Sequence, residues 1–129
     1  MENLPVILVV EDDHLVRSVV EDSLTDGGFE IVTASSGENA VELLGASEGK
    51  YRALVTDINL GEDKIDGWDV ARCAREIDPN FPVVYMSGKD AEDWASKGVP
   101  HSIMLTKPFA PAQLVTAVSQ LLNVGTPPA

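Results

Sequence analysis

The sequence has a single cysteine, Cys73, and few aromatic residues, which make up 5% of its 129 residues. A single cysteine excludes a disulfide within the chain. No apolar run approaches the roughly 20 residues that a membrane-spanning helix needs. The opening residues, Met-Glu-Asn-Leu-Pro, lack the basic start and long apolar region of a signal peptide. We therefore expect a cytoplasmic protein that does not enter a membrane.

Basic residues are also scarce, since 9 Lys and Arg stand against 21 Asp and Glu, which gives a net charge of −12. A protein that binds DNA or RNA needs basic groups to displace the counterions of the phosphates, so we expect no nucleic-acid partner. The same charge is a poor match for an anionic membrane surface. It suits a protein that meets cations or the basic surfaces of other proteins.

The sequence does have the apolar content of a folded domain. Hydrophobic residues make up 44% of the chain, and its length allows one ordinary domain with a substantial core. We find no internal repeat and no linker to a second domain. The expected organisation is a domain over residues 1–124 followed by a flexible tail over residues 125–129.

Short apolar segments alternate with segments of helical periodicity. We expect strands at 5–10, 29–33, 53–57, 82–86 and 102–105. We expect helices to begin after residue 13, at Ser35, at Asp66, at Ala91 and at Pro111, and in the first of them Leu15, Val16, Val19, Val20 and Leu24 recur at helical spacing. This alternation predicts an α/β fold, a doubly wound (βα)5 sheet of five parallel strands in the flavodoxin-like order 2-1-3-4-5.

Three of the predicted helices carry recognisable start signals. Ser35 and Glu38 have the spacing of a capping box for the second helix. Asp66 is suited to cap the third helix, and Pro111 is suited to the first turn of the last.

Chemically active side chains follow four of the five predicted strands. Glu11 and Asp12 follow the first strand, Asp57 ends the third, Ser87 follows the fourth and Lys107 follows the fifth. The carboxyl ends of parallel strands meet at one edge of the sheet, so these side chains can converge. The acids belong to the strands at which the strand order reverses, where open α/β sheets bind their ligands.

Three carboxylates in one cleft repel each other unless one is protonated or a cation lies between them. Oxygen ligands without His or Cys favour a hard ion such as Mg²⁺. A cation on one side and Lys107 on the other would let an anionic phosphoryl donor approach Asp57. The Asp57 carboxylate could then attack phosphorus and form an acyl phosphate, while Ser87 donates a hydrogen bond to a phosphoryl oxygen.

With these residues the chain resembles the response-regulator receiver domains of two-component signalling over essentially its whole length. The likeness rests on residues 9–13, on Asp57, on the Asp66-Gly67 and Ser87-Gly88 pairs, and on Lys107-Pro108-Phe109. The resemblance implies that Asp57 is the phosphoacceptor.

The resemblance also implies roles for the neighbouring residues. Glu11, Asp12, Asp57 and the backbone carbonyl of Asn59 would hold Mg²⁺. Ser87 would act as the switch hydroxyl, Lys107 would pair with the phosphoryl group, and the Lys107-Pro108 peptide bond would be cis.

The partners implied by the resemblance are proteins. A sensor histidine kinase or a histidine phosphotransfer protein would supply the phosphoryl group, and a downstream protein would receive the signal. The responsive face would consist of the fourth helix, the fifth strand and the fifth helix, and a homodimer that forms on phosphorylation is compatible with it. We expect a single-domain protein that catalyses its own phosphorylation and dephosphorylation and is not a turnover enzyme.

The chain departs from the usual receiver pattern at several positions. The loop at residues 60–65 is longer than usual, and Gly88 stands where Ala is common. Met104 occupies the position, three residues before Lys107, at which receivers usually have Tyr or Phe. Because Met is unbranched and flexible, we expect phosphorylation alone to produce a shallow population shift that partner binding completes.

Three alternatives compete with this interpretation. A phosphotransferase of the haloacid-dehalogenase type would need a second Asp two residues after the nucleophile, where this chain has Asn59. A flavin binder would need a phosphate-binding loop after the first strand, where Glu11, Asp12 and Asp13 would repel the phosphate. A receiver-like scaffold that binds its partner without phosphorylation stays open.

Overall fold

The computed structural model describes residues 4–46, 49–61, 64–88 and 91–123. The elements in chain order are β1 (Val6–Val10), α1 (His14–Asp26), β2 (Glu30–Ala34), α2 (Gly37–Ala46), β3 (Ala53–Asp57), α3 (Gly67–Ile77), β4 (Val83–Ser87), a 3₁₀ turn (Ala91–Asp93), α4 (Trp94–Lys97), β5 (Ile103–Thr106) and α5 (Pro111–Asn123). The tail expected at residues 125–129 lies outside the described residues.

The five strands form one parallel sheet in the order β2-β1-β3-β4-β5, as predicted. All residues of β3 are buried, which explains why the strand is apolar over residues 53–55 before it ends in Thr56 and the Asp57 carboxylate. The chain leaves β1 toward β2 on one side and returns to β3 on the other. The carboxyl ends of β1 and β3 therefore flank the switch point of the sheet.

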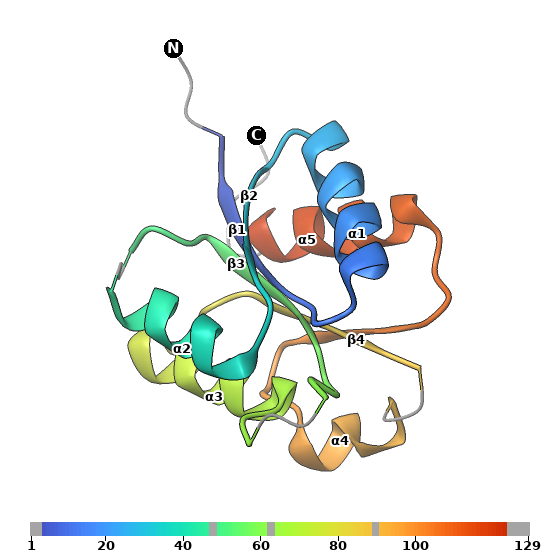
Figure 1. The fold of residues 1–129 in the computed structure, drawn as a ribbon. Coiled ribbons are helices and arrows are strands. Elements are labelled where there is room, and N and C mark those ends of the chain that lie inside the picture. Colours follow the sequence, from blue (N-terminus) through green and yellow to red (C-terminus); the bar gives the residue numbers. More distant parts are fainter. Residues whose placement is uncertain (1–3, 47–48, 62–63, 89–90, 124–129) are drawn as a thin grey trace.

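Helices cover both faces of the sheet (Figure 1). Helices α1 and α5 pack on one face, where Val20, Leu24, Leu114 and Val118 contact alternate strand residues such as Val9 and Val55. Helices α2 and α3 pack on the other face, where Ala40, Leu44, Val70 and Ala74 contact Leu8, Val10 and Leu54. Because both faces are buried, neither shows the polar alternation of a half-exposed sheet.

Helix α3 begins at the predicted cap. The Asp66 carboxylate accepts a hydrogen bond from the Asp69 N–H at 2.9 Å, and the Asp69 carboxylate accepts one from the Asp66 N–H at 3.2 Å. This reciprocal pair is a capping box that fixes the first turn directly after the loop of Asp57.

The capping box predicted for Ser35 and Glu38 is wrong by one residue. Ser36 Oγ accepts the hydrogen bond from the Asn39 N–H at 3.0 Å, and α2 begins at Gly37. The start is set by packing, because Gly37 lies so close to Ile65 that a Cβ there would overlap it. Sequence spacing alone carries no trace of that contact.

Strand ends shift slightly from their expected positions. β4 runs to Ser87 and β5 runs to Thr106, each one residue further than predicted. Ser87 is therefore the last residue of a strand, paired with Thr106 on β5.

Candidate functional site

Two buried carboxylates lie at the carboxyl ends of neighbouring strands. Glu11 directly follows β1 and is 1% exposed, while Asp57 ends β3 and is 7% exposed. Backbone hydrogen bonds hold both ends in place: the Glu11 N–H donates to the Ala34 carbonyl and the Ile58 N–H donates to the Met86 carbonyl, each at 3.1 Å. The sheet itself thus positions the two acids.

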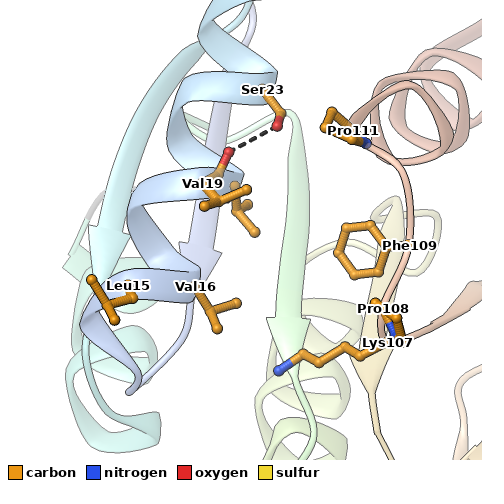
Figure 2. A pocket seen from close by; sticks show the side chains of 9 residues that line it. Leu15, Val16, Val19, Ser23, Lys107, Pro108, Phe109 and Pro111 are labelled. Carbon is orange, nitrogen blue, oxygen red and sulfur yellow. Dashed lines mark hydrogen bonds between the residues drawn. The ribbon is translucent and has the colours of Figure 1, made fainter.

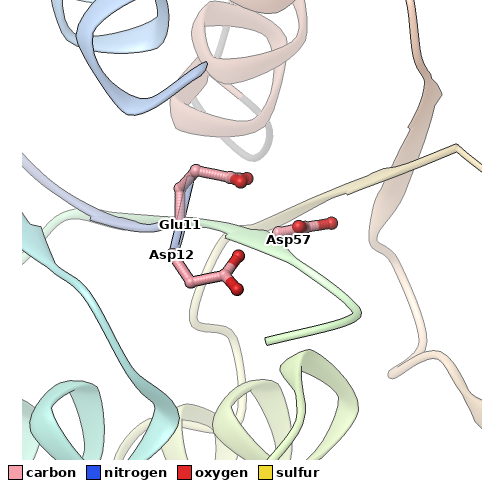
Figure 3. A group of neighbouring side chains, drawn as sticks. All are labelled: Glu11, Asp12 and Asp57. Atoms are coloured by element: carbon pink, nitrogen blue, oxygen red, sulfur yellow. The ribbon is translucent and has the colours of Figure 1, made fainter. Parts of the chain in front are cut away.

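Asp12 completes a group of three acids at this edge (Figure 3). One carboxylate oxygen from each of Glu11, Asp12 and Asp57 lies within 4.8 Å of the others, although Asp12 itself is exposed. That spacing lets one small cation contact more than one of them. The donor set is oxygen only, which suits a hard divalent ion.

Lys107 lies between the two buried acids. Its Nζ is 3.3 Å from Glu11 Oε2 and 3.3 Å from Asp57 Oδ2. The backbone N–H of Lys107 donates to the Ser87 carbonyl at 2.8 Å, which ties the residue to the end of β4. The Lys107-Pro108 bond is cis, as predicted.

Lys107 alone does not compensate for the negative charge and the burial of the two acids. Burial, followed by repulsion from Asp57, raises the pKa of Glu11 from 4.5 to about 7, and Lys107 offsets only part of that. Burial also raises the pKa of Asp57, against the lowering effects of Lys107 and of the Ile58 N–H. A cation among the acids would favour their ionised forms, so the residues present fit a metal site.

Ser87 lies at the same edge, 1% exposed at the end of β4, the strand next to β3. Asp57 pairs in register with Met86, the residue before Ser87. Met104 lies further back, within β5 and opposite Tyr85 on β4. The edge therefore gathers Glu11, Asp12, Asp57, Ser87 and Lys107, and Met104 lies behind them.

Two glycines shape the site in ways that the sequence did not reveal. A Cβ at Gly67 would overlap the Asp57 carbonyl oxygen and lie 2.7 Å from Ile58 Cα, so the first turn of α3 packs directly on the backbone of the acid. Gly61 has φ +74°, a conformation that other residues rarely adopt, and a Cβ there would lie 3.0 Å from Asp12 Oδ2. Their placement shows that α3 and the β3–α3 loop close against the acids.

Two more polar residues border the acids. Arg17 on α1 donates through Nη1 to the Glu11 carbonyl at 3.0 Å, an anchor that helical periodicity could not indicate. The Asn59 side chain accepts a hydrogen bond from the Gly61 N–H at 3.1 Å. The metal-binding role expected for the Asn59 backbone carbonyl stays a prediction.

An apolar groove opens beside Lys107, between α1 and the segment that leads into α5 (Figure 2). Its walls include Leu15, Val19, Phe109 and Pro108. Leu15 is 76% exposed and Val19 is 58% exposed, although both share the helical spacing of the buried residues Val20 and Leu24. The apolar stripe of α1 is wider than the sheet can cover, and its outer part forms this groove.

Comparisons with known proteins agree with this geometry. The family model of the response regulator receiver domain matches residues 7–119, so the chain belongs to that family. A solved response regulator receiver protein from Sinorhizobium medicae WSM419 is 50% identical, with a TM-score of 0.91, and the match covers 95% of this chain and 97% of that one.

Curated relatives extend the comparison to larger proteins. The transcriptional regulatory protein PrrA of Mycobacterium tuberculosis is 37% identical over 92% of this chain and 50% of the relative. The sensor kinase CckA of Brucella abortus is 31% identical over 91% of this chain and 12% of the relative. The chain spans about half the length of the first curated relatives that it matches.

The family match also decides among the alternatives. The haloacid-dehalogenase and flavin-binding interpretations have no support in it, whereas the receiver fold and family are as predicted. Among the described residues, no helix is both long enough and apolar enough to cross a membrane. The cytoplasmic location stays a prediction.

Proposed function

We propose that this receiver domain accepts a phosphoryl group on Asp57 from a phosphohistidine, in a step that depends on Mg²⁺. The observation that carries the proposal is the arrangement of Asp57, whose carboxylate lies against Lys107 Nζ at 3.3 Å and within 4.8 Å of the oxygens of Glu11 and Asp12. In-line phosphoryl transfer to a carboxylate requires positive charge beside the acceptor, and this edge of the sheet offers Lys107 and a group of acids that can hold a cation.

In the proposed transfer an Asp57 carboxylate oxygen attacks phosphorus, the bond between phosphorus and the donor histidine nitrogen breaks, and the electron pair stays on that nitrogen. Lys107 holds a phosphoryl oxygen from one side and Ser87 donates its hydroxyl proton to another. Mg²⁺, held directly by Asp12, Asp57 and the Asn59 carbonyl and through water by Glu11, would neutralise charge on the transferred group. The product is an acyl phosphate on the chain itself, so the domain is a reactant and not a turnover enzyme.

The donor would be a sensor histidine kinase or a histidine phosphotransfer protein. Its histidine must reach Asp57, and the apolar groove of Leu15, Val19 and Phe109 begins at Lys107, so the groove lies where such a protein would rest. We propose that the output is contact with a downstream protein and that the chain does not bind DNA, since its net charge of −12 repels phosphates. A phosphorylation-dependent homodimer and a domain confined to residues 1–124 belong to the same proposal.

Labelling with a small phosphodonor tests the assignment. Acetyl phosphate with Mg²⁺ should add one phosphoryl group that intact-mass measurement detects and that base or hydroxylamine removes. The Asp57→Asn variant should remain unlabelled. Asp22→Asn, a matched change at an exposed Asp on α1, should label like the wild type.

The same experiment separates the remaining alternative. Equal labelling of Asp57→Asn and wild type would refute Asp57 as the acceptor. A wild-type chain that no donor labels, yet that binds a partner, would support the scaffold that works without phosphorylation.

A further inference from the structure

The aromatic ring of Tyr85 lies next to Met104, the position at which receivers usually have an aromatic side chain. Tyr85 is two residues before Ser87 on β4, so both side chains leave the strand on the same face. Tyr85 is fully buried, its ring centroid is 4.7 Å from that of Trp68, and its partner in register on β5 is Met104. Tyr85 thus connects the strand that ends at the site with the place where receivers usually carry their aromatic switch.

The hydroxyl group of Tyr85 holds the connection between α4 and β5. It accepts a hydrogen bond from the Val99 N–H at 3.0 Å. The Val99 carbonyl accepts one from Ser102 Oγ at 2.7 Å, and Ser102 Oγ accepts one from Trp94 Nε1 at 2.9 Å. Hydrogen bonds on the two sides of Val99 therefore link the buried ring to an indole that is 39% exposed.

Residues 94–102, which we name the α4–β5 corner, also meet the core at Val99, which packs against it, and at His101, whose carbonyl accepts a hydrogen bond from Arg75 Nη2 at 3.4 Å. Helix α4 has 4 residues and none of them is buried. Gly98 is closely packed against Trp94, since a Cβ there would lie 2.8 Å from the Trp94 carbonyl oxygen. The corner is internally tight, so loss of the bond from Tyr85 would move it as a unit.

We infer that Tyr85 carries the phosphorylation state of Asp57 from Ser87 to the α4–β5 corner, an inference that rests on the proposed function. When the Ser87 hydroxyl moves toward a phosphoryl group, the end of β4 moves with it and displaces the Tyr85 ring on the same face. Met104 yields the space because its three side-chain torsions adapt easily. The Tyr85 hydroxyl then leaves the Val99 N–H, and the corner loosens as far as Trp94.

The energy involved is within reach of a phosphorylation event. The hydrogen bond between the Val99 N–H and Tyr85 contributes little net stability. A phosphoryl group that binds the loosened state only modestly better than the closed state can therefore shift the equilibrium between them. In this chain the aromatic ring that responds would be Tyr85 on β4, and the flexible Met104 on β5 would make room for it, whereas in other receivers the responding ring is on β5. The signal would emerge on α4 and not through a side chain of β5.

Amide and indole hydrogen exchange, followed by NMR on the whole ¹⁵N-labelled chain, tests this coupling. Beryllofluoride with Mg²⁺ should speed exchange at the Val99 N–H and the Trp94 indole N–H by about fivefold to tenfold, the factor that loss of one net hydrogen bond gives. Labelling by acetyl phosphate is measured in parallel by intact mass. Labelled protein in which Val99 and Trp94 stay unchanged would overturn the inference alone, whereas a failure to label would overturn it together with the proposed function.

Two variants locate the coupling. Tyr85→Phe keeps the ring and removes the hydroxyl, so Val99 should exchange fast before any phosphoryl mimic is added and should not respond to it. Ser102→Ala is the matched control: it should free the Trp94 indole while Val99 still responds. A full Val99 response in Tyr85→Phe would show that another residue carries the signal. The wild-type experiment alone decides the matter if Tyr85→Phe does not fold.

Discussion

The acidic edge of the sheet and the α4–β5 corner show different tolerance of change. At the edge, buried Glu11 and Asp57 are fixed by backbone hydrogen bonds and by Lys107, at 3.3 Å from each. At the corner, α4 buries none of its residues, and on the neighbouring β5 Met104 stands where receivers usually have an aromatic side chain. Transfer of a charged group depends steeply on distance and sign, whereas readout needs only two packings of similar energy. The edge therefore keeps the family pattern, and the corner can depart from it.

Adding a methyl group at three glycines gives the largest contrast. Gly67→Ala should lower the free energy of unfolding by about 3 kcal/mol or more, because its Cβ would overlap the Asp57 backbone, which cannot move. Gly98→Ala at the corner should cost less, about 1 to 2 kcal/mol: its Cβ would lie 2.8 Å from the Trp94 carbonyl oxygen, but α4 buries none of its residues and its backbone can move. Gly88→Ala, with open space around it, should change stability by less than about 0.5 kcal/mol.

Urea denaturation of the three variants measures these differences. Equal losses for Gly67→Ala and Gly98→Ala would remove the distinction between a rigid edge and an adaptable corner.

Stability should also depend on the ionisation of Glu11. Its pKa is about 7 in the folded chain against 4.5 when exposed, so the folded state binds more protons between these values. The contribution of Glu11 is therefore most favourable below pH 4.5 and is lost as the pH rises through about 7. In the absence of Mg²⁺, Glu11→Gln should match the wild type at low pH and exceed its stability at pH 8, by at most about 3 kcal/mol.

Unfolding curves of the two proteins from pH 4 to pH 8 measure the difference. A constant gap across this range would show that Glu11 does not titrate as the buried edge requires.

Magnesium should stabilise the edge by a smaller amount. Ligand at ten times its dissociation constant adds about 1.4 kcal/mol to a folded state that alone binds it. The melting temperature should therefore rise at millimolar Mg²⁺, and Asp12→Ala should abolish the rise. A rise that persists in Asp12→Ala would place the ion elsewhere.

The smallest expected effect concerns the switch. With beryllofluoride, the wild type should show a partial shift of NMR resonances around β5, and Met104→Tyr should convert further toward one state. Complete conversion of the wild type without a partner, equal to that of Met104→Tyr, would refute the shallow switch.

Much of the fold could be predicted from the alternation of apolar strand segments with helical segments. Apolar strands such as 53–57, each followed by a helical segment, predict the parallel sheet, and its geometry brings Glu11, Asp57 and Lys107 to one edge. What pattern could not show are the contacts between distant segments. The packing of Gly37 on Ile65 moved the cap of α2, and the exposure of Leu15 depends on how much of α1 the sheet can cover.

The convergence of the charged residues could be predicted from the sequence, whereas the contacts that support them could not. The charged residues follow strands directly, so their positions are encoded locally. The supporting residues act across the fold: Arg17 reaches the Glu11 carbonyl and Tyr85 reaches Val99, and neither contact has a spacing in the sequence.

The hydrogen bond from the Gly67 N–H to the Ile58 carbonyl, 2.8 Å long, has a consequence for protein engineering. It closes the β3–α3 loop at its base. Within the loop, Leu60 is buried in the core and Ile65 packs against Gly37, so contacts with distant segments fix both residues. Lengthening a closed loop adds an entropic cost that grows only logarithmically. The cost of inserting a peptide tag or a sensor module at this loop would therefore come from displacing Leu60 and Ile65 and not from the entropy of the longer loop.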